Sequence, residues 1–337
     1  MGRPRIAVVG AGYWGVAHVR TFAAEAGCEL TWVCDRSAAA LGRAQALAPG
    51  VRLTERFDQL LTARDVDAVV VATPSSTHAE LASRALETGR HVLVEKPLAL
   101  SVPDAELVAR AADRAGAVLL VGHLMLYHPV VARLGAMVDA GELGELYYVS
   151  STRVNLGRLR SDENALWSLG PHDLSMLDHL IRAPVTAVTA RGEGFLQPGI
   201  HDVVFVTISF ARPGGGPPIM AHVHLSWLNP RKERRLTIVG SRKMVEFDDV
   251  ARDKLHVHDR GYDRPPPFSS FAEYLTLRDG PITIPQVPMV EPLAAMAAHF
   301  VACIERREAP RTDAASGVRV VRLLAAAQAS LDGAGGG

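Results

Sequence analysis

A glycine-rich turn near the amino terminus restricts the possible folds more than any other feature of the sequence. Gly10-Ala11-Gly12-Tyr13-Trp14-Gly15 follows a short β-branched run and precedes residues with helical apolar spacing. In such a turn the first glycine permits tight bending, the second lets a pyrophosphate approach the backbone, and the third lets helix pack on strand. Free N–H groups at the helix start then face the phosphate. We therefore expect a Rossmann-type dinucleotide site, with Tyr13 and Trp14 flanking the pyrophosphate.

An acidic residue follows at the position that such a site requires. Asp35 ends the second apolar run, about 20 residues beyond Gly15. A carboxylate there can accept hydrogen bonds from the adenosine ribose and repels a 2′-phosphate. Arg36 opposes this preference, because arginine can pair with that phosphate or stack on adenine. The balance favours NAD over NADP as the cofactor.

Strand-like and helix-like segments alternate through the first third of the chain. The expected strands are 5–9, 30–34, 68–72, 91–94 and 118–121, and the expected helices are 14–24, 37–47, 77–86 and 103–115. This alternation predicts an α/β fold with a doubly wound parallel sheet.

Longer strand-like runs dominate the rest of the chain and predict an antiparallel sheet. Expected strands are 146–154, 185–190, 203–210, 219–227, 235–239 and 244–247, with helices at 129–140, 171–181, 291–305 and 317–331. We expect a Rossmann domain at 1–122, a substrate-binding and oligomerisation domain at 123–332, and a disordered tail at 333–337.

Charge and cysteine content exclude several classes of partner. Lysine plus arginine and aspartate plus glutamate both number 36, which gives no electrostatic reason to expect nucleic acid or an anionic membrane. The three cysteines form no metal-type spacing, and no signal-like or membrane-spanning apolar run is present, so a reduced cytoplasmic protein is expected. The pairs His222/His224 and His256/His258 lack the third ligand that zinc requires, so we expect no metal.

Two further motifs follow predicted strands: Ala72-Thr73-Pro74-Ser75-Ser76-Thr77-His78 and Glu95-Lys96-Pro97. Together with the glycine turn they resemble the Gfo/Idh/MocA oxidoreductase family, and Gly170-Pro171-His172-Asp173 continues the resemblance. It implies a C-terminal α/β domain with an open, mostly antiparallel sheet, homodimers or homotetramers built through that sheet, and an active site in an interdomain cleft. It also implies that the cofactor is lined by Thr73, Pro74, Ser75, His78 and Glu95, although His78 could instead face solvent at a helix start.

Lys96 is the first candidate for the chemistry. Because it precedes a proline, its backbone is pushed toward an extended conformation, and a lysine half-buried beside a positive nicotinamide ring would have a lowered pKa suited to proton exchange. The resemblance implies that it is the catalytic lysine and that the Lys96–Pro97 bond is cis. The alternative is a surface lysine at a strand end.

His172 is the second candidate. Pro171 predicts a helix start, which places His172 in a first turn that disfavours imidazolium, and the resemblance implies an acid/base role. Many relatives have an aspartate four residues before this histidine, whereas this chain has Ser168. Either Lys96 or His172 could therefore be the principal base.

Three segments narrow the resemblance: Arg153-Val154-Asn155-Leu156-Gly157-Arg158, Asp162-Glu163-Asn164-Ala165-Leu166-Trp167 and Ser226-Trp227-Leu228-Asn229-Pro230. They resemble a branch of the family that includes dehydrogenases acting on C3 of UDP-N-acetyl-hexosamines. Arginine forks suit a diphosphate, although an exposed basic loop would look the same. A cyclitol, a free sugar or a specialised-metabolite sugar is the alternative substrate, and a non-catalytic NAD(H)-binding sensor is the alternative class. Besides Lys96 and His172, the candidate substrate residues are Arg153, Asn155, Arg158, Arg160, Asn164, Trp167 and Asp173.

Overall fold

A six-stranded parallel sheet organises the first part of the computed structural model, which describes residues 2–157, 159–263 and 275–333. The predicted site residue Arg158 and residues 334–337 of the predicted tail lie outside the described residues. The strand order is β3-β2-β1-β4-β5-β6. The chain adds strands on one side of β1 up to β3 and then continues on the other side from β4, so the order in sequence reverses between β1 and β4. Ligands of such sheets bind at the carboxyl ends of the strands beside that reversal. The strands are β1 (Arg5–Val9), β2 (Glu29–Cys34), β3 (Arg52–Thr54), β4 (Ala68–Val71), β5 (His91–Val94) and β6 (Leu119–Val121).

The strands at the centre of this sheet are apolar on both faces. All four residues of β4, Ala-Val-Val-Val, are buried, as expected for a parallel strand covered by helices on each side. Two hydrophobic clusters lie on the two faces, one containing Val8 and Leu93 and the other Val9 and Val94. The covering helices are α1 (Tyr13–Ala24), α2 (Ala38–Leu47), α3 (Phe57–Thr62), α4 (His78–Glu87), α5 (Val102–Ala115) and α8 (Pro292–Arg306), with short 3-10 turns η1 (Ser75–Thr77) and η2 (Leu124–Tyr127).

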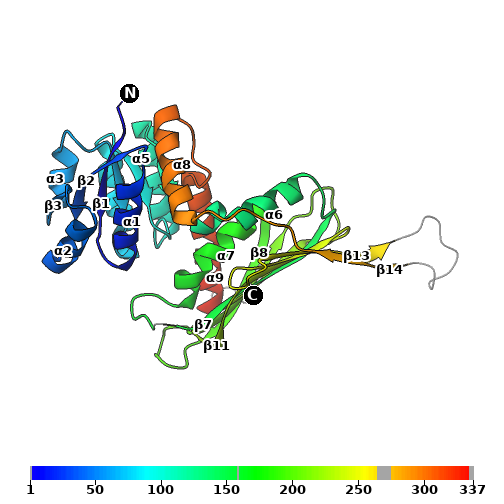
Figure 1. The fold of residues 1–337 in the computed structure, drawn as a ribbon. Helices are drawn as coiled ribbons and strands as arrows, with labels where there is room; N and C mark the ends of the chain where they lie inside the picture. Colours follow the sequence, from blue (N-terminus) through cyan, green and yellow to red (C-terminus); the bar gives the residue numbers. More distant parts are fainter. Residues whose placement is uncertain (1, 158, 264–274, 334–337) are drawn as a thin grey trace. The chain divides into compact units, whose positions relative to one another are not determined.

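Helix α8 returns to this sheet from the far end of the sequence. The chain divides into one unit of Met1–His128 with Val290–Arg322 and another of Pro129–Met289 with Leu323–Gly337, whereas the sequence-based division assigned 291–305 to the second domain. Phe300 meets Phe22 of α1 edge to face at 6.5 Å, and Met296 and Ala297 are buried in the same cluster as Val8. Figure 1 shows α8 in orange beside α1. Burial of its apolar face explains the return.

An eight-stranded sheet organises the second unit. Its order is β14-β13-β12-β11-β7-β10-β9-β8, and neighbours are antiparallel except for the parallel pair β7 and β10. The predicted fold class is therefore confirmed. The strands are β7 (Leu146–Leu156), β8 (Val185–Glu193), β9 (Val203–Phe210), β10 (Ile219–Ser226), β11 (Leu228–Gly240), β12 (Met244–Asp248), β13 (Leu255–Asp263) and β14 (Thr276–Thr283).

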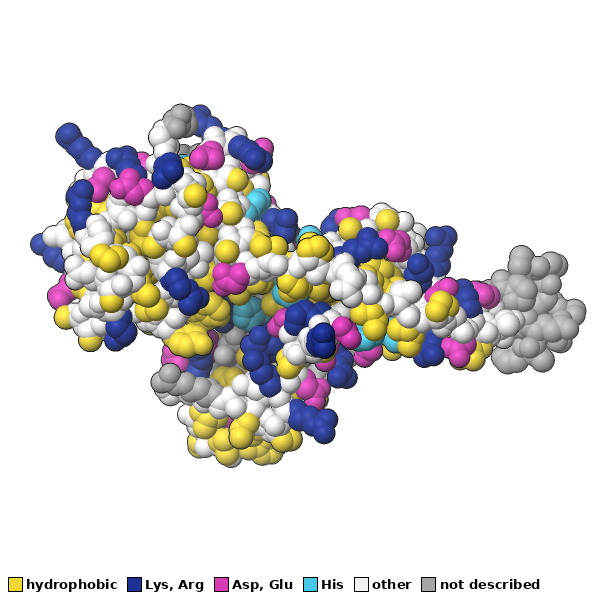
Figure 2. All heavy atoms as spheres, in the orientation of Figure 1, with side chains coloured by type: hydrophobic (Ala, Val, Ile, Leu, Met, Phe, Trp, Pro, Cys, Tyr) yellow, Lys and Arg dark blue, Asp and Glu magenta, His cyan; other side chains and the backbone are white. Residues whose placement is uncertain are grey.

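Helices cover one face of this second sheet. Figure 1 shows α6 (Pro129–Asp139) and α7 (Ala165–Ile181) on that face, with the end of α9 (Ala314–Leu331) beside them. Side chains alternate along the central strands, so β10 buries Ala221 and Val223 and exposes Met220 and His222. In Figure 2, side chains of both charge signs are interspersed over the visible face of each unit, in keeping with the balanced composition.

Candidate active site

Three loops that contain predicted site residues leave the first sheet at one edge. Strands β1, β4 and β5 are neighbours and parallel, so the residues that follow them emerge together. Gly10 begins the first loop, Thr73 lies in the second, and Glu95 begins the third. Backbone hydrogen bonds fix the first residues of each loop to a neighbouring strand, for example from Glu95 N to the carbonyl of Val71 at 2.9 Å. The structure therefore brings the glycine turn and the Glu95-Lys96 segment to the same edge.

The glycine turn is sterically demanding at two positions and open at a third. Gly10 has a φ of +89°, and a Cβ there would lie 2.6 Å from the carbonyl oxygen of Ala72. A Cβ on Gly15 would lie 1.8 Å from the carbonyl oxygen of Gly10, whereas a Cβ on Gly12 would meet nothing within 4 Å. Gly12 caps α1 without a side-chain hydrogen bond, and the first turn contains no acidic residue. This open helix start fits the pyrophosphate of a dinucleotide.

The two aromatic residues of the turn project outward. Tyr13 is 91% exposed and Trp14 is 38% exposed, and their rings meet edge to face at 6.1 Å. Neither ring packs into the core, so both surfaces are available to a bound ligand.

Asp35 joins the second strand to the glycine turn. Its Oδ2 accepts a hydrogen bond from Ala11 N at 2.6 Å, and its Oδ1 accepts one from Ser37 N at 2.8 Å. Each carboxylate oxygen can accept a second bond, so the group can still bind ribose hydroxyls. Arg36 beside it is exposed. The arrangement fits the adenosine end of NAD.

His78 links the loops that follow β4 and β5. The ring is 1% exposed, and it lies between two carbonyl oxygens, that of Thr73 at 2.9 Å from Nε2 and that of Pro97 at 2.7 Å from Nδ1. The alternative of a solvent-facing histidine is therefore wrong. Pro74 and Ser75 form the turn that precedes α4, and the Lys96–Pro97 bond is cis, as predicted.

Glu95 is engaged by a histidine that sequence reasoning missed. His18 of α1 is fully buried, and its Nε2 lies 2.7 Å from Glu95 Oε1. Glu95 Oε2 accepts a hydrogen bond from the backbone N–H of Lys96 at 3.2 Å. Burial alone would raise the pKa of Glu95, but the hydrogen bonds from His18 and from the Lys96 backbone, together with the charge of Lys96, lower it overall. The sequence did contain a signal for this contact. His18 lies three residues after Gly15 and four before Phe22, which places it on the apolar face of α1.

His123, which follows β6, was also missed. Its side chain is 1% exposed, and neither ring nitrogen has a hydrogen-bond partner among the residues that the structure describes. Burial lowers the pKa of His123 to about 4, and the positive charge of Lys96 contributes to that shift while the charge of Glu95 opposes it. His123 is therefore a neutral neighbour of the Glu95-Lys96 segment at pH 7.

The helix that contains His172 begins earlier than predicted. Helix α7 starts at Ala165, and Asn164 caps it by accepting a hydrogen bond from Trp167 N at 3.1 Å. Pro171 lies inside the helix, so the expected start at this proline is wrong. His172 is half-buried in the third turn of α7. The helix dipole acts mainly on the first turn, so the expectation that it disfavours imidazolium at His172 does not apply. Ser168 lies one turn earlier on the same helix face.

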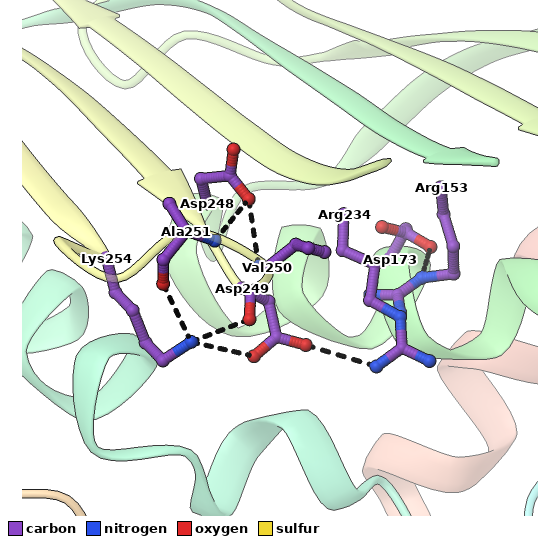
Figure 3. A network of polar contacts seen from close by, with 8 residues as sticks. All are labelled: Arg153, Asp173, Arg234, Asp248, Asp249, Val250, Ala251 and Lys254. Atoms are coloured by element: carbon purple, nitrogen blue, oxygen red, sulfur yellow. Dashed lines mark hydrogen bonds and ion pairs between the residues drawn. The ribbon is translucent and has the colours of Figure 1, made fainter. Parts of the chain in front are cut away.

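Arg153 and Asp173 are brought together inside the second unit. Arg153 Nε lies 2.5 Å from Asp173 Oδ2, the hydroxyl of Ser151 donates to Asp173 Oδ1 at 2.7 Å, and both charged side chains are more than nine-tenths buried. Figure 3 shows this pair beside Arg234, which pairs with Asp249 at 3.2 Å. The Arg153 guanidinium is thus engaged in an ion pair within the protein.

Other predicted substrate residues also have protein partners. Asn164 and Trp167 both donate to the side-chain oxygen of Gln328, at 2.9 and 3.2 Å. Arg160 pairs with Glu163 at 2.7 Å while remaining about half exposed, and Asn155 is half-buried. Of the predicted basic set, Arg160 is the described arginine that is accessible.

Clusters of metal-ligating residues and membrane-spanning helices are both absent from the described part of the chain. There, no group of three or more His, Cys, Asp or Glu residues could hold a metal ion. His224 stacks on Phe205 at 4.4 Å, and His258 lies 3.6 Å from Glu246. No helix in the same residues has the length and apolar character to cross a bilayer.

Residues 4–123 match the oxidoreductase family with an NAD-binding Rossmann fold, and residues 131–246 match the Gfo/Idh/MocA C-terminal domain. Together these matches cover more than half of the chain. The protein belongs to the Gfo/Idh/MocA family. Its N-terminal unit is accordingly an NAD-binding Rossmann domain, and its second unit contains the C-terminal domain typical of Gfo/Idh/MocA proteins.

Relatives in the Gfo/Idh/MocA family carry several activities. Inositol 2-dehydrogenase 2 of Paenarthrobacter aurescens TC1 is 34% identical over 219 residues, which are 61% of this chain and 65% of that protein. UDP-N-acetylglucosamine 3-dehydrogenase GnnA of Acidithiobacillus ferrooxidans is 25% identical with a TM-score of 0.78, covering 99% of both chains. GenD2 from gentamicin A biosynthesis, solved with NAD, is 25% identical with a TM-score of 0.80, covering 98% of this chain and 95% of that one. The chain aligns with about three fifths of the length of its curated relatives.

Proposed function

We propose that this protein is an NAD-dependent dehydrogenase that transfers a hydride between a carbinol carbon of a sugar and nicotinamide. The observation that carries the proposal is the convergence of the open glycine turn and the Glu95-Lys96 segment at one edge of the Rossmann sheet. A dinucleotide that extends from the turn along this edge would reach the Lys96 loop, because ligands of such sheets follow the carboxyl ends of the strands.

The residues of the chain have separate tasks in this proposal. The helix start at Gly12 binds the pyrophosphate, and Asp35 accepts hydrogen bonds from the adenosine ribose. Lys96 exchanges a proton with the substrate hydroxyl, and His172 is the second acid/base group. NAD, when bound, supplies the hydride acceptor, so the protein has to align the reactants and exclude water.

The proposed substrate is a UDP-linked N-acetyl-hexosamine that is oxidised at C3. The likeness to the UDP-N-acetylglucosamine 3-dehydrogenase over 99% of both chains supports this choice. Arg160 and Asn155 are the candidate contacts for the diphosphate, since Arg153 is engaged by Asp173. Asn164 and Trp167 support that region by holding Gln328.

A cyclitol is the second candidate substrate, and two observations favour it. The inositol 2-dehydrogenase is the more similar in sequence, at 34% identity. In addition, Arg153 forms an internal ion pair with Asp173. A neutral polyol has no diphosphate, so it does not require this arginine as a ligand.

A substrate panel tests both candidates. Purified protein is incubated with NAD or NADP and a set of UDP-linked amino sugars, inositols and free sugars, and reduced cofactor is followed by absorbance. We expect turnover with NAD and a UDP-N-acetyl-hexosamine. Turnover with inositol alone would replace the first candidate by the second, and cofactor binding without any turnover would favour a sensor.

A further inference from the structure

His18 and Glu95 form a largely buried pair of side chains that connects two segments of the proposed cofactor site. His18 belongs to α1, the helix that the glycine turn opens, and Glu95 follows β5 directly before Lys96. Their contact at 2.7 Å joins these two elements, and His18 has no exposed side-chain surface. The contact therefore connects the helix proposed to bind the pyrophosphate with the segment proposed to carry out the chemistry.

The hydrogen bonds of His18 indicate the charge of the pair. Nε2 faces the Glu95 carboxylate and must carry hydrogen to donate to it. Nδ1 is buried and has no partner among the described residues, so a second hydrogen on that atom would lack an acceptor in a dry environment, which is unfavourable. The neutral Nε2–H form satisfies this geometry, and the pair then carries the single negative charge of Glu95.

Two basic residues, His123 and Lys96, lie near this charge. His123 is neutral at pH 7 because burial lowers its pKa to about 4, and Lys96 is the cation whose backbone Glu95 binds directly. Gly122 packs closely against Glu95, because a Cβ there would lie 3.2 Å from it. The largely buried carboxylate thus acts on Lys96 and on any cationic group bound at this edge of the sheet, where charges are screened less than in bulk water.

We propose that His18 and Glu95 are positioning residues that fix the Lys96 backbone and maintain a buried negative charge, which favours the oxidised, cationic form of the cofactor over the reduced form. This inference rests on the proposed function, because it assumes that nicotinamide binds beside Lys96. The oxidised ring carries a positive charge that the reduced ring lacks. The carboxylate therefore raises the affinity for NAD relative to the affinity for NADH.

Coenzyme titrations of the full-length protein test the inference without requiring a substrate. Kd values for NAD and NADH are measured for the wild type and for Glu95→Gln, which keeps the shape and removes the charge. We expect NAD binding to weaken about tenfold relative to NADH binding in E95Q. A purely structural role would weaken both coenzymes to the same extent.

Variants of His18 provide the second test. In His18→Gln the side-chain amide can still donate to Glu95, and we expect a NAD-to-NADH affinity ratio within twofold of the wild type. His18→Leu removes the donor, so Glu95 should become protonated and the ratio should shift in the same direction as in E95Q. Glu87→Gln removes an exposed carboxylate at the end of α4 and is the matched control.

The outcomes distinguish failure of the proposed function from failure of the role proposed for His18 and Glu95. Wild-type protein that binds neither coenzyme would overturn the proposed function and this inference together. Wild-type protein that binds both, with an unchanged affinity ratio in folded E95Q and H18L, would overturn the inference alone. Thermal denaturation of each variant establishes that it is folded.

Discussion

Asp35 organises the glycine turn through its hydrogen bond with Ala11, and in the proposed function it also binds the adenosine ribose. Both tasks use the same carboxylate, so its replacement should change cofactor choice as well as affinity.

We predict that Asp35→Ser lowers the preference for NAD over NADP by tenfold or more, on the order of 1.4 kcal/mol. The substitution removes the charge that repels a 2′-phosphate and leaves Arg36 free to pair with it. Kd values for both oxidised coenzymes measure the effect. An unchanged preference would show that Asp35 does not bind the adenosine ribose.

Lys96 is the residue whose loss should separate binding from chemistry. We predict that Lys96→Met lowers kcat by about 10² to 10⁴, the usual contribution of an acid/base group, while NADH binding stays within a few-fold of the wild type. Steady-state kinetics with the best substrate of the panel and fluorescence titration of NADH provide the two readouts. Lys232→Met, at an exposed position of β11, is the control, and equal losses in both variants would contradict the assigned role.

Buried histidines should make stability depend on pH. Burial lowers the pKa of His123 to about 4, below the unfolded value of about 6.5, so the unfolded chain binds a proton more readily between these values. The stabilising contribution is therefore complete above pH 6.5 and is lost as the pH falls toward 4, by up to roughly 3 kcal/mol. Burial lowers the pKa values of His91, His224 and His299 as well, which adds in the same direction.

Urea denaturation at several pH values between 4.5 and 7.5 checks this expectation. The wild type should lose stability steadily on acidification, and His123→Leu should show a shallower dependence because it has no proton to gain. Equal slopes in the two proteins would exclude His123 as a contributor.

At the scale of elements, the Arg153–Asp173 ion pair joins β7 to α7. Both partners are buried, and Asp173 directly follows His172, so the pair also determines where this part of α7 lies on the sheet.

We predict that Asp173→Asn destabilises the second unit by about 3–5 kcal/mol, because it leaves the Arg153 charge buried without a counterion. Arg160→Met breaks a half-exposed pair with Glu163 and should cost about 1 kcal/mol or less. Denaturation midpoints of the two variants give the comparison, and similar losses would contradict the assigned importance of the buried pair.

Local patterns predicted some elements well and others poorly, for physical reasons. The glycine turn and the runs around β1, β4 and β5 combine strong periodicity with steric requirements, so both the Rossmann sheet and its site edge could be predicted. The start of α7 was missed because proline usually marks a first turn, whereas here Asn164 caps the helix earlier. Strand β14 contains Asp279, Gly280 and Pro281 and is largely exposed, so its pairing with β13 decides its conformation.

Side-chain partners were the least predictable part of the site. Nothing in the spacing of Arg153 and Asp173, or of His18 and Glu95, indicates that they meet, because each pair joins two elements that are distant in sequence. The same limitation made Arg153 look like an accessible phosphate ligand.

At the scale of the whole molecule, the return of α8 to the first unit is the main departure from a simple division at residue 122. The helix fills one face of the Rossmann core with Phe300, Met296 and Ala297. The N-terminal unit therefore depends on residues that are synthesised near the end of the chain.

We predict that Phe300→Ala destabilises the first unit by about 3–5 kcal/mol, the usual cost of deleting a fully buried aromatic ring. Hydrogen exchange followed by peptide should show faster exchange in β1 and α1, which share a hydrophobic cluster with α8, than in the strands of the second unit. Uniform exchange across both units would argue against a separate N-terminal core.

The parallel pairing of β7 with β10 has a consequence for how the second sheet assembles. The hairpins β8–β9, β9–β10 and β11–β12 join strands that follow one another in sequence, whereas α7, β8 and β9 separate β7 from β10 along the chain. Closing such a long loop costs entropy before any contact compensates for it. The centre of the sheet should consequently be its slowest part to acquire protection during refolding, and earlier protection of β7 than of the hairpin strands in pulse-labelling would contradict this order.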